Sequence, residues 1–269
     1  MRNAPADAGA HPASDEAVEI VNAGGKGPFV IACEHASNNI PAEFAALGVS
    51  ADVLQSHAAW DPGARAVALH LSAMLDAPLV ASRISRLVYD CNRPPMSDGA
   101  TPAKSEIHAI PGNAGLTATQ KRRRAELAYF PFRSALSRVL SSKGRDVALV
   151  TVHSFTPVWF GKPREVEIGV LHDADARLAD ALLAEIAMRA PGRRIERNEP
   201  YGPTDGVTHT LIDQALPRGL PNVMLEIRND LIADAASQQA HATLLAQALQ
   251  AAMSALSPVP VAVERLAHA

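Results

Sequence analysis

A series of short apolar segments, separated by longer stretches of helical periodicity, sets the strongest limit on how this chain can fold. Each segment is rich in Val, Ile and Leu, and most are apolar throughout. They lie at 29–33, 78–82, 86–90, 147–153, 166–171 and 222–227. Strands that helices cover on both faces have this composition. The sequence therefore predicts these segments as strands of a mostly parallel, mixed sheet.

Helical patterns lie between the predicted strands. Residues 62–76 begin with a proline at the first helical position and carry an apolar stripe, and Asp61 precedes them as a natural N-cap. Thr117 and Gln120 have the spacing of a capping box, ahead of a helix to about residue 142. Further helices are predicted over 174–189 and 234–256. Strands alternating with helices predict a three-layer α/β/α fold.

One domain is the first expectation for 269 residues, of which 48% are hydrophobic. Residues 1–17 and 257–269 lack periodicity and are typical of flexible tails, which leaves 18–256 as the folded domain. The segment 94–115 has no clear periodicity and is long for a connection inside a compact domain. We expect it to be a functional loop.

Charge and apolar length exclude several classes of protein. The 25 basic and 28 acidic residues give a net charge of -3 without long basic blocks, which argues against a nucleic-acid binder. No apolar run approaches the roughly 20 residues of a membrane span, and the first 19 residues lack a signal-peptide core. Two cysteines suit a reducing compartment. We expect a cytoplasmic monomer or small homo-oligomer that binds neither membranes nor nucleic acid.

Polar residues stand at the ends of several predicted strands. His35 follows the first strand, Asn92 and Arg93 follow the third, and His153 ends the fourth. Glu226 lies within the last strand. Ligands of open α/β sheets bind beyond the carboxyl ends of the strands. The sequence therefore predicts that these side chains line one basin.

His35 and His153 are candidate zinc ligands, because a catalytic zinc takes three protein ligands and keeps one position for water. Taken alone, each histidine fits an ordinary hydrogen-bonded role better than a metal-binding one. Asp61 is the candidate third ligand, although it could instead cap the following helix. Glu34 and His57 remain alternatives, and His57 could simply orient a ligand.

Asn92 and Arg93 indicate a different kind of site. A guanidinium beside a carboxamide can hold a substrate carboxylate through charge-assisted hydrogen bonds. Arg86 lies just upstream and adds positive charge to an otherwise acidic chain, which favours an anionic substrate. The alternative is a structural arginine paired with Asp90.

Glu226 would be costly to bury in its apolar strand without a partner. An ion pair with Arg228 or Arg86 would give it a structural role. A functional role is that of general base, which takes the proton of the attacking water and returns it to the leaving nitrogen.

Motifs in order along the chain resemble the N-formylglutamate amidohydrolase family, whose fold is similar to that of zinc carboxypeptidases and aspartoacylases. The motifs are CEHASNNIP at 33–41, HAAWDPGA at 57–64, RLVYDCNRP at 86–94, TVHSF at 151–155, EIGVL at 167–171, NEPYGPTDGVTHTL at 198–211 and LPNVMLEIRNDLI at 220–232. Each motif is weak alone, but the ordered set spans nearly the whole folded region.

The resemblance implies one α/β/α domain with one zinc ion, which hydrolyses N-formyl-L-glutamate or a related N-acyl amino acid. Asn92 and Arg93 look like the pair that holds the substrate carboxylate in carboxypeptidase-like enzymes, and Glu226 falls where that fold keeps its general base. One departure is Asn38, three residues after His35, where those enzymes have a glutamate ligand. For this reason we assign Asp61 as the third ligand, with His35 and His153.

Two alternatives come from other classes of protein. Cys33 or Cys91 could be the thiolate nucleophile of a cysteine-dependent amidase, assisted by one of the histidines. The basin could also bind an acidic metabolite without catalysis. Glu226 argues against this binding hypothesis and for an enzyme, because a site that only binds anions gains nothing from a carboxylate.

Overall fold

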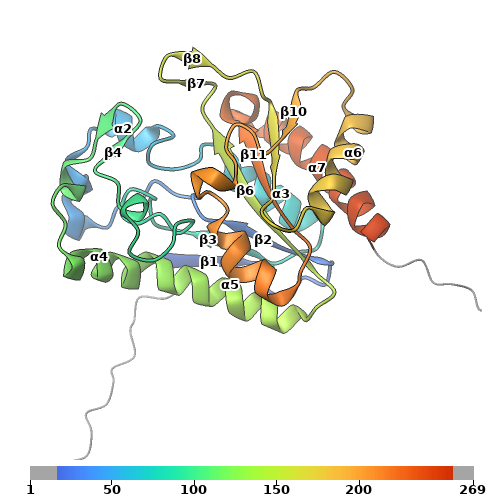
Figure 1. Cartoon of the computed structure of the whole chain (residues 1–269), viewed down its shortest axis with the longest axis horizontal. Coiled ribbons are helices and arrows are strands. Elements are labelled where there is room, and N and C mark those ends of the chain that lie inside the picture. Colours follow the sequence, from blue (N-terminus) through green and yellow to red (C-terminus); the bar gives the residue numbers. More distant parts are fainter. Residues whose placement is uncertain (1–16, 257–269) are drawn as a thin grey trace, which may run out of the picture.

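A computed structural model describes residues 17–256, so the tails predicted at 1–17 and 257–269 lie outside the described residues apart from Ala17. A seven-stranded sheet has the order β1-β3-β2-β6-β11-β9-β10 (Figure 1). Its strands are β1 Val18–Val21, β2 Phe29–Cys33, β3 Leu79–Ser82, β6 Ala148–Phe155, β9 Ile168–Leu171, β10 Ile195–Arg197 and β11 Asn222–Arg228. Only the β1–β3 and β9–β11 pairs are antiparallel among the described strands of this sheet. The prediction of a mostly parallel mixed sheet is confirmed.

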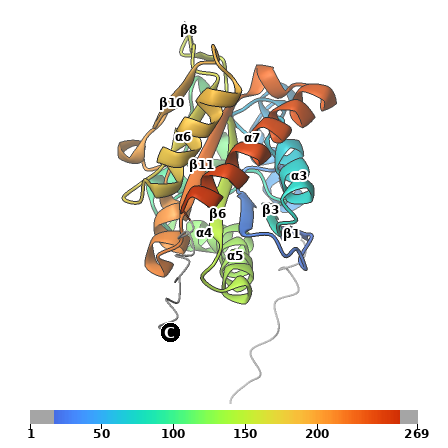
Figure 2. The ribbon, with the colours of Figure 1, turned by 90° about the vertical axis from the view of Figure 1, so that its right-hand side faces the viewer.

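Helices cover both faces of the sheet. Figure 2 shows α3, α6 and α7 side by side on one face, and α5 packs on the other. Successive side chains of β2 point to opposite faces of the sheet. Ile31 packs against α3 and α7, whereas Val30 packs toward α5. The helices are α2 Ala51–Gln55, α3 Ala64–Met74, α4 Ala118–Arg124, α5 Phe130–Lys143, α6 Arg177–Arg189 and α7 Ala235–Leu256. The three-layer α/β/α architecture is therefore confirmed.

Local sequence explains where the helices begin. Thr117 and Gln120 form the predicted capping box at the start of α4, and a π-helical segment, Ala125–Tyr129, joins α4 to α5. Gly63, not Asp61, is the N-cap of α3. Its φ of 81° is in the left-handed region, and an added Cβ would lie 2.5 Å from the carbonyl oxygen of Ile232. A glycine is required there, and the side chain of Asp61 is left for another use.

One predicted strand is wrong. Residues 86–90 form turns, as the hydrogen bond from the Val88 N–H to the Ser85 carbonyl shows. The side chains of Leu87, Val88 and Tyr89 are buried in the core on the α5 face, so the run is apolar for a reason other than strand formation. A short apolar run can fill a core from a turn as well as from a strand, and periodicity does not distinguish the two.

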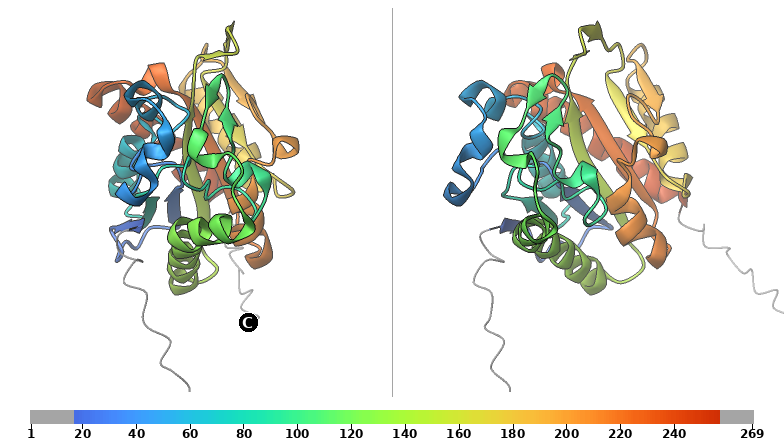
Figure 3. Two further views of the ribbon diagram at one scale, coloured as in Figure 1. Left: turned by 90° about the vertical axis from the view of Figure 1, so that its left-hand side faces the viewer. Right: turned by 60° about the vertical axis from the view of Figure 1, so that its left-hand side comes forward.

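The long segment 94–115 contains only short elements, including the hairpin of β4 Lys104–Ser105 and β5 His108–Ala109. Both views of Figure 3 show this green segment in the foreground. A second small hairpin, of β7 Val158–Trp159 and β8 Lys162–Pro163, extends beyond the end of β6. No helix within residues 17–256 is long and apolar enough to cross a membrane.

Candidate active site

All of the residues that the sequence predicts for the site line one cavity of about 570 Å³, within the usual range for ligand pockets. They are His35, Asp61, Arg86, Asn92, Arg93, His153 and Glu226. His35 follows β2, His153 lies in β6 and Glu226 lies in β11, and these three strands are neighbours in the sheet. The strand order brings them to one edge of the sheet, as the ends of parallel strands predict.

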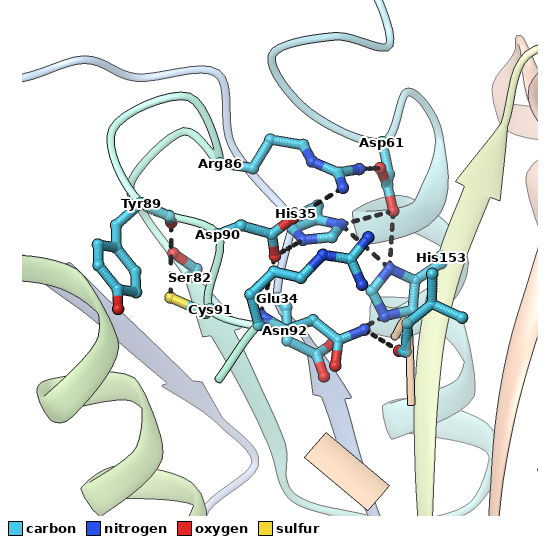
Figure 4. Close-up of polar contacts among 12 residues, drawn as sticks. Glu34, His35, Asp61, Ser82, Arg86, Tyr89, Asp90, Cys91, Asn92 and His153 are labelled. Atoms are coloured by element: carbon cyan, nitrogen blue, oxygen red, sulfur yellow. Dashed lines mark hydrogen bonds and ion pairs between the residues drawn. The ribbon is translucent and has the colours of Figure 1, made fainter. Parts of the chain in front are cut away.

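His35, Asp61 and His153 meet in a buried group (Figure 4). Asp61 Oδ2 lies 2.8 Å from His153 Nδ1 and 3.3 Å from His35 Nδ1, and the two Nδ1 atoms are 3.2 Å apart. Zinc bonds of roughly 2.0–2.1 Å in a tetrahedron require ligand atoms roughly 3.3–3.4 Å apart. The donor types and their spacing therefore fit a zinc ion with three protein ligands.

A carboxylate lies behind each imidazole. His35 Nε2 is 2.7 Å from Asp90 Oδ1, and His153 Nε2 is 3.1 Å from Glu34 Oε2. Metal-binding histidines commonly donate their second ring N–H to such a partner, which fixes the ring and the tautomer. Both rings are held so that Nδ1 faces the centre of the group. Glu34 thus lies behind a candidate ligand and is not itself one of the three ligands.

Asp61 is held in place by its surroundings as well as by the histidines. Its backbone N–H donates to the His35 carbonyl at 3.0 Å, and the Ser154 N–H donates to its Oδ2 at 3.3 Å. Arg86 Nη1 lies 3.3 Å from Asp61 Oδ1, and its Nη2 lies 2.8 Å from Asp90 Oδ2. Arg86 therefore links the candidate ligand to the carboxylate that orients His35.

The charges within the group support one another. Burial opposes the ionisation of Asp61, but the two imidazoles outweigh burial and hold the pKa of its carboxyl below the usual range. Burial also opposes a charged His153, yet Glu34 and Asp61 raise the pKa of its imidazole well above the ordinary value. The pKa of His35 is raised as well, because Asp90 and Asp61 outweigh burial and the charge of Arg86. The group is an anionic environment that holds positive charge.

Glu226 lies opposite His153 in the register between β11 and β6. Its side chain is only 4% exposed, and its Oε2 has no hydrogen-bond partner in the described part of the chain. Arg228 pairs with Asp230, and Arg86 pairs with Asp61 and Asp90. The ion pair considered for Glu226 is therefore absent among the described residues.

Burial is the largest cause of the altered acidity of Glu226. It raises the pKa of this carboxyl to about 7, with the charge of His153 opposing the rise and that of Asp61 adding to it. A carboxyl with this pKa can both take up and release a proton near neutral pH. Its position in the cavity makes it a candidate general base.

Asn92 and Arg93 have different surroundings, although both line the cavity. The amide of Asn92 donates to the Val207 carbonyl, and its oxygen accepts from the Thr210 N–H at 3.0 Å. Arg93 donates to the Gly206 carbonyl and has no ion pair among the described residues. Asn92 is thus bound to the 207–210 loop, whereas Arg93 keeps an unpaired charge. The carboxylate that was considered as its partner, Asp90, pairs with Arg86.

Sequence reasoning missed other residues in the cavity wall or behind it. Asp90 and Glu34 were visible beside predicted site residues, but nothing in the sequence showed that they orient histidines. His57 lies 3.0 Å from Glu106 through its Nε2, so it pairs with the long segment and not with the metal group. Arg164 and Tyr201 also line the cavity. Arg164 follows the two-residue strand β8 and Tyr201 lies in a loop, so neither follows a strand that the sequence predicts.

Neither cysteine lines the cavity, and both are buried. Burial raises the pKa of both thiols well above the ordinary value, and Asp61 adds to the rise at Cys33 while Asp90 adds to it at Cys91. A nucleophilic cysteine needs a thiolate. These surroundings disfavour the cysteine-dependent hypothesis.

The model of the N-formylglutamate amidohydrolase family matches residues 27–233. Among solved structures, the gene product Atu2144 from Agrobacterium tumefaciens is 53% identical, with a TM-score of 0.87 over 91% of this chain and 98% of that chain. The N-formylglutamate amidohydrolase from Ralstonia eutropha JMP134 is 18% identical, with a TM-score of 0.63 over 89% of this chain and 99% of that chain. The second likeness concerns the fold alone. No curated protein matches the chain.

Proposed function

The chain belongs to the N-formylglutamate amidohydrolase family, and from that premise we propose that it is a zinc-dependent hydrolase of N-formyl-L-glutamate or a related N-acyl amino acid. The products are the free amino acid and formate or another short carboxylate. The observation that carries this proposal is the buried His35–Asp61–His153 group beside Glu226, whose Oε2 has no hydrogen-bond partner among residues 17–256.

Three side chains would hold the metal: His35 and His153 through Nδ1, and Asp61 through Oδ2. Bound zinc supplies a Lewis acid that polarises the acyl carbonyl and makes water a better nucleophile near neutral pH. Asp90 and Glu34 keep the two rings in the required orientation, and Arg86 holds Asp61.

Glu226 acts as the general base in this proposal. Its Oε2 takes the proton from the water that attacks the acyl carbon, and the same oxygen then gives that proton to the amide nitrogen as the C–N bond breaks. A base with a pKa near 7 serves both steps, because neither proton transfer is strongly uphill.

Arg93 binds the carboxylate of the substrate. Its charge has no partner among the described residues, and planar guanidinium groups bind carboxylates in a bidentate manner. Asn92 contributes to the same subsite by holding the 207–210 loop beside Arg93. Arg86 contributes positive charge to the cavity while its guanidinium positions Asp61 and Asp90.

We further propose the setting of this activity. Residues 18–256 act as one catalytic domain on a small anionic substrate in the cytoplasm, as a monomer or small homo-oligomer, without a nucleic-acid or membrane partner.

Metal removal tests the proposal. Purified protein is treated with a chelator, and formate release from N-formyl-L-glutamate is measured before and after addition of Zn²⁺. We expect activity to be lost and then restored, and Cys33→Ser and Cys91→Ser to remain active. Hydrolysis that survives metal removal but is lost in either folded cysteine variant would instead support a thiolate nucleophile. Binding of N-acyl amino acids without any hydrolysis would support the binding-protein alternative.

A further inference from the structure

Arg164 lies in an aromatic cage on the wall of the cavity. Its guanidinium carbon is 4.8 Å from the ring centroid of Trp159, 4.7 Å from that of Tyr201 and 5.7 Å from that of Phe155. Aromatic faces attract a guanidinium and remove water from it. The three rings therefore hold the position of this cation inside the cavity wall.

The backbone of Arg164 is also fixed. Its N–H donates to the Pro157 carbonyl at 2.8 Å, and its carbonyl accepts from Arg228 Nη1 at 3.0 Å. These contacts hold the residue at the foot of the β7–β8 hairpin. A side chain fixed at both its backbone and its guanidinium loses little conformational entropy when it binds a ligand.

Contacts with the long segment hold the same hairpin in place. The Phe160 N–H donates to Glu106 Oε1 at 2.9 Å, and Glu106 Oε2 lies 3.0 Å from His57 Nε2. The His57 ring packs edge-on against Trp159, with 6.0 Å between ring centroids. Trp159, one wall of the Arg164 cage, is thus held by His57, and the hairpin is held by Glu106; all three residues line the cavity.

The hydrogen bonds of Arg164 leave most of its donors unused. A guanidinium has five N–H donors in a planar fork, and within the described chain its side chain donates only to the Tyr201 hydroxyl, at 2.8 Å. No carboxylate of residues 17–256 pairs with it, although the side chain is half-buried. A half-buried charge without a counter-ion is costly unless a ligand supplies that counter-ion.

We propose that Arg164 determines specificity by binding an anionic group on the substrate's side chain, so that the enzyme prefers N-acyl derivatives of acidic amino acids. This inference rests on the proposed function. Arg93 and Arg164 reach the cavity from different segments, 90–93 and the chain just after β8, and neither has an ion pair among the described residues. Arg93 binds the carboxylate common to every N-acyl amino acid, and Arg164 binds the second carboxylate, which only acidic side chains have.

The test compares N-formyl-L-glutamate with N-formyl-L-glutamine, which has nearly the same shape but an uncharged side chain. Wild-type protein should prefer the glutamate derivative in kcat/KM by roughly 10- to 100-fold, the range of a charge-assisted hydrogen bond. Arg164→Gln should remove this preference, mainly by raising KM for the glutamate derivative, and should leave hydrolysis of the glutamine derivative nearly unchanged. Arg164→Lys should restore part of the preference, because it keeps the charge but loses the planar fork.

Lys162→Gln is the matched control. It removes a positive charge from the same hairpin, but Lys162 is exposed and does not line the cavity. We expect this variant to keep the wild-type preference. If Lys162→Gln and Arg164→Gln reduce the preference for the glutamate derivative equally, the preference comes from the total positive charge of the hairpin. The assignment of specificity to Arg164 is then wrong.

Binding of the free amino acids separates this inference from the proposed function. Calorimetry should show that the protein binds glutamate more tightly than glutamine, and that Arg164→Gln removes the difference. A protein that hydrolyses neither formyl compound but keeps this binding pattern would overturn the proposed function and support the role of Arg164. A preference that survives Arg164→Gln in both assays would overturn the inference alone.

Discussion

Replacing Glu226 with glutamine tests the proposed general base most directly, because the change keeps the shape of the side chain and removes its basicity. General-base catalysis typically contributes about 10²- to 10⁴-fold in rate. We therefore expect Glu226→Gln to reduce kcat by at least about 10²-fold. Zinc content should stay at the wild-type level, because the three proposed ligands are unchanged.

The same substitution should alter the pH dependence of stability. Folding raises the pKa of Glu226 from an ordinary value of 4.5 to about 7, so the folded chain binds more protons than the unfolded chain between these values. Stability must then fall as the pH rises through this window. At 1.36 kcal/mol per pKa unit, the loss by pH 8 is roughly 3 kcal/mol. Glu226→Gln has no such loss.

Thermal unfolding of the metal-free proteins at pH 5 and pH 8 measures this difference. For a chain of this size, roughly 3 kcal/mol corresponds to about 5–10 °C in Tm. Wild type should lose this much more than Glu226→Gln between the two pH values. Equal pH dependence in both proteins would refute the stability argument. A Glu226→Gln protein that loses its zinc, or keeps most of its activity, would refute the assignment as general base.

Three further predictions concern the metal group and the substrate. Asp90→Asn and Glu34→Gln should each weaken zinc binding by about 10- to 100-fold, measured by competition with a chelator, because they release one imidazole from its orientation; unchanged affinity would contradict that role. Arg93→Ala should lower kcat/KM for N-formyl-L-glutamate by the equivalent of about 2–5 kcal/mol and should leave kcat/KM for an uncharged formamide nearly unchanged. An equal loss of kcat/KM for both substrates would mean that Arg93 has a structural role. Zinc binding at pH 6 should release close to two protons, measured by calorimetry in buffers of different ionisation enthalpy, because His35 and His153 are protonated before the ion binds.

The sheet could be predicted from the sequence because its central strands are buried on both faces. Five of the predicted strands are present, and all five are short segments rich in Val, Ile or Leu. The edge strands β1 and β10 were not predicted, because each is short and contains at least one charged residue. The strand prediction for residues 86–90 was wrong because the apolar side chains of this run enter the core from a turn.

The meeting of His35 and His153 was predictable for a topological reason, and the residues around them were not. The ends of β2 and β6 lie side by side, so the backbone positions of His35 and His153 are close together. The direction of a side chain beyond a strand end depends on the loop, so periodicity could not show that Glu34 turns toward His153. Arg164 depends on the β7–β8 hairpin, which has two residues per strand and leaves almost no pattern in the sequence.

The predicted and the unpredicted residues in and around the metal group together carry equal numbers of negative and positive charges. Three carboxylates, those of Glu34, Asp61 and Asp90, lie against the two imidazoles and Arg86. With both imidazoles protonated, three negative charges face three positive ones. A divalent ion that replaces the two imidazole protons preserves this balance.

Glu226 is a fourth buried carboxyl near this group, and it forms no ion pair with any residue of 17–256. Burial without a counter-ion raises its pKa, whereas the paired carboxyls of Asp61 and Asp90 have lowered pKa values. The cations that hold Asp61 and Asp90 ionised do not pair with Glu226, which can therefore exchange a proton near neutral pH. The proposed ligand Asp61 and the proposed base Glu226 therefore differ in acidity because the nearby cations pair with one and not with the other.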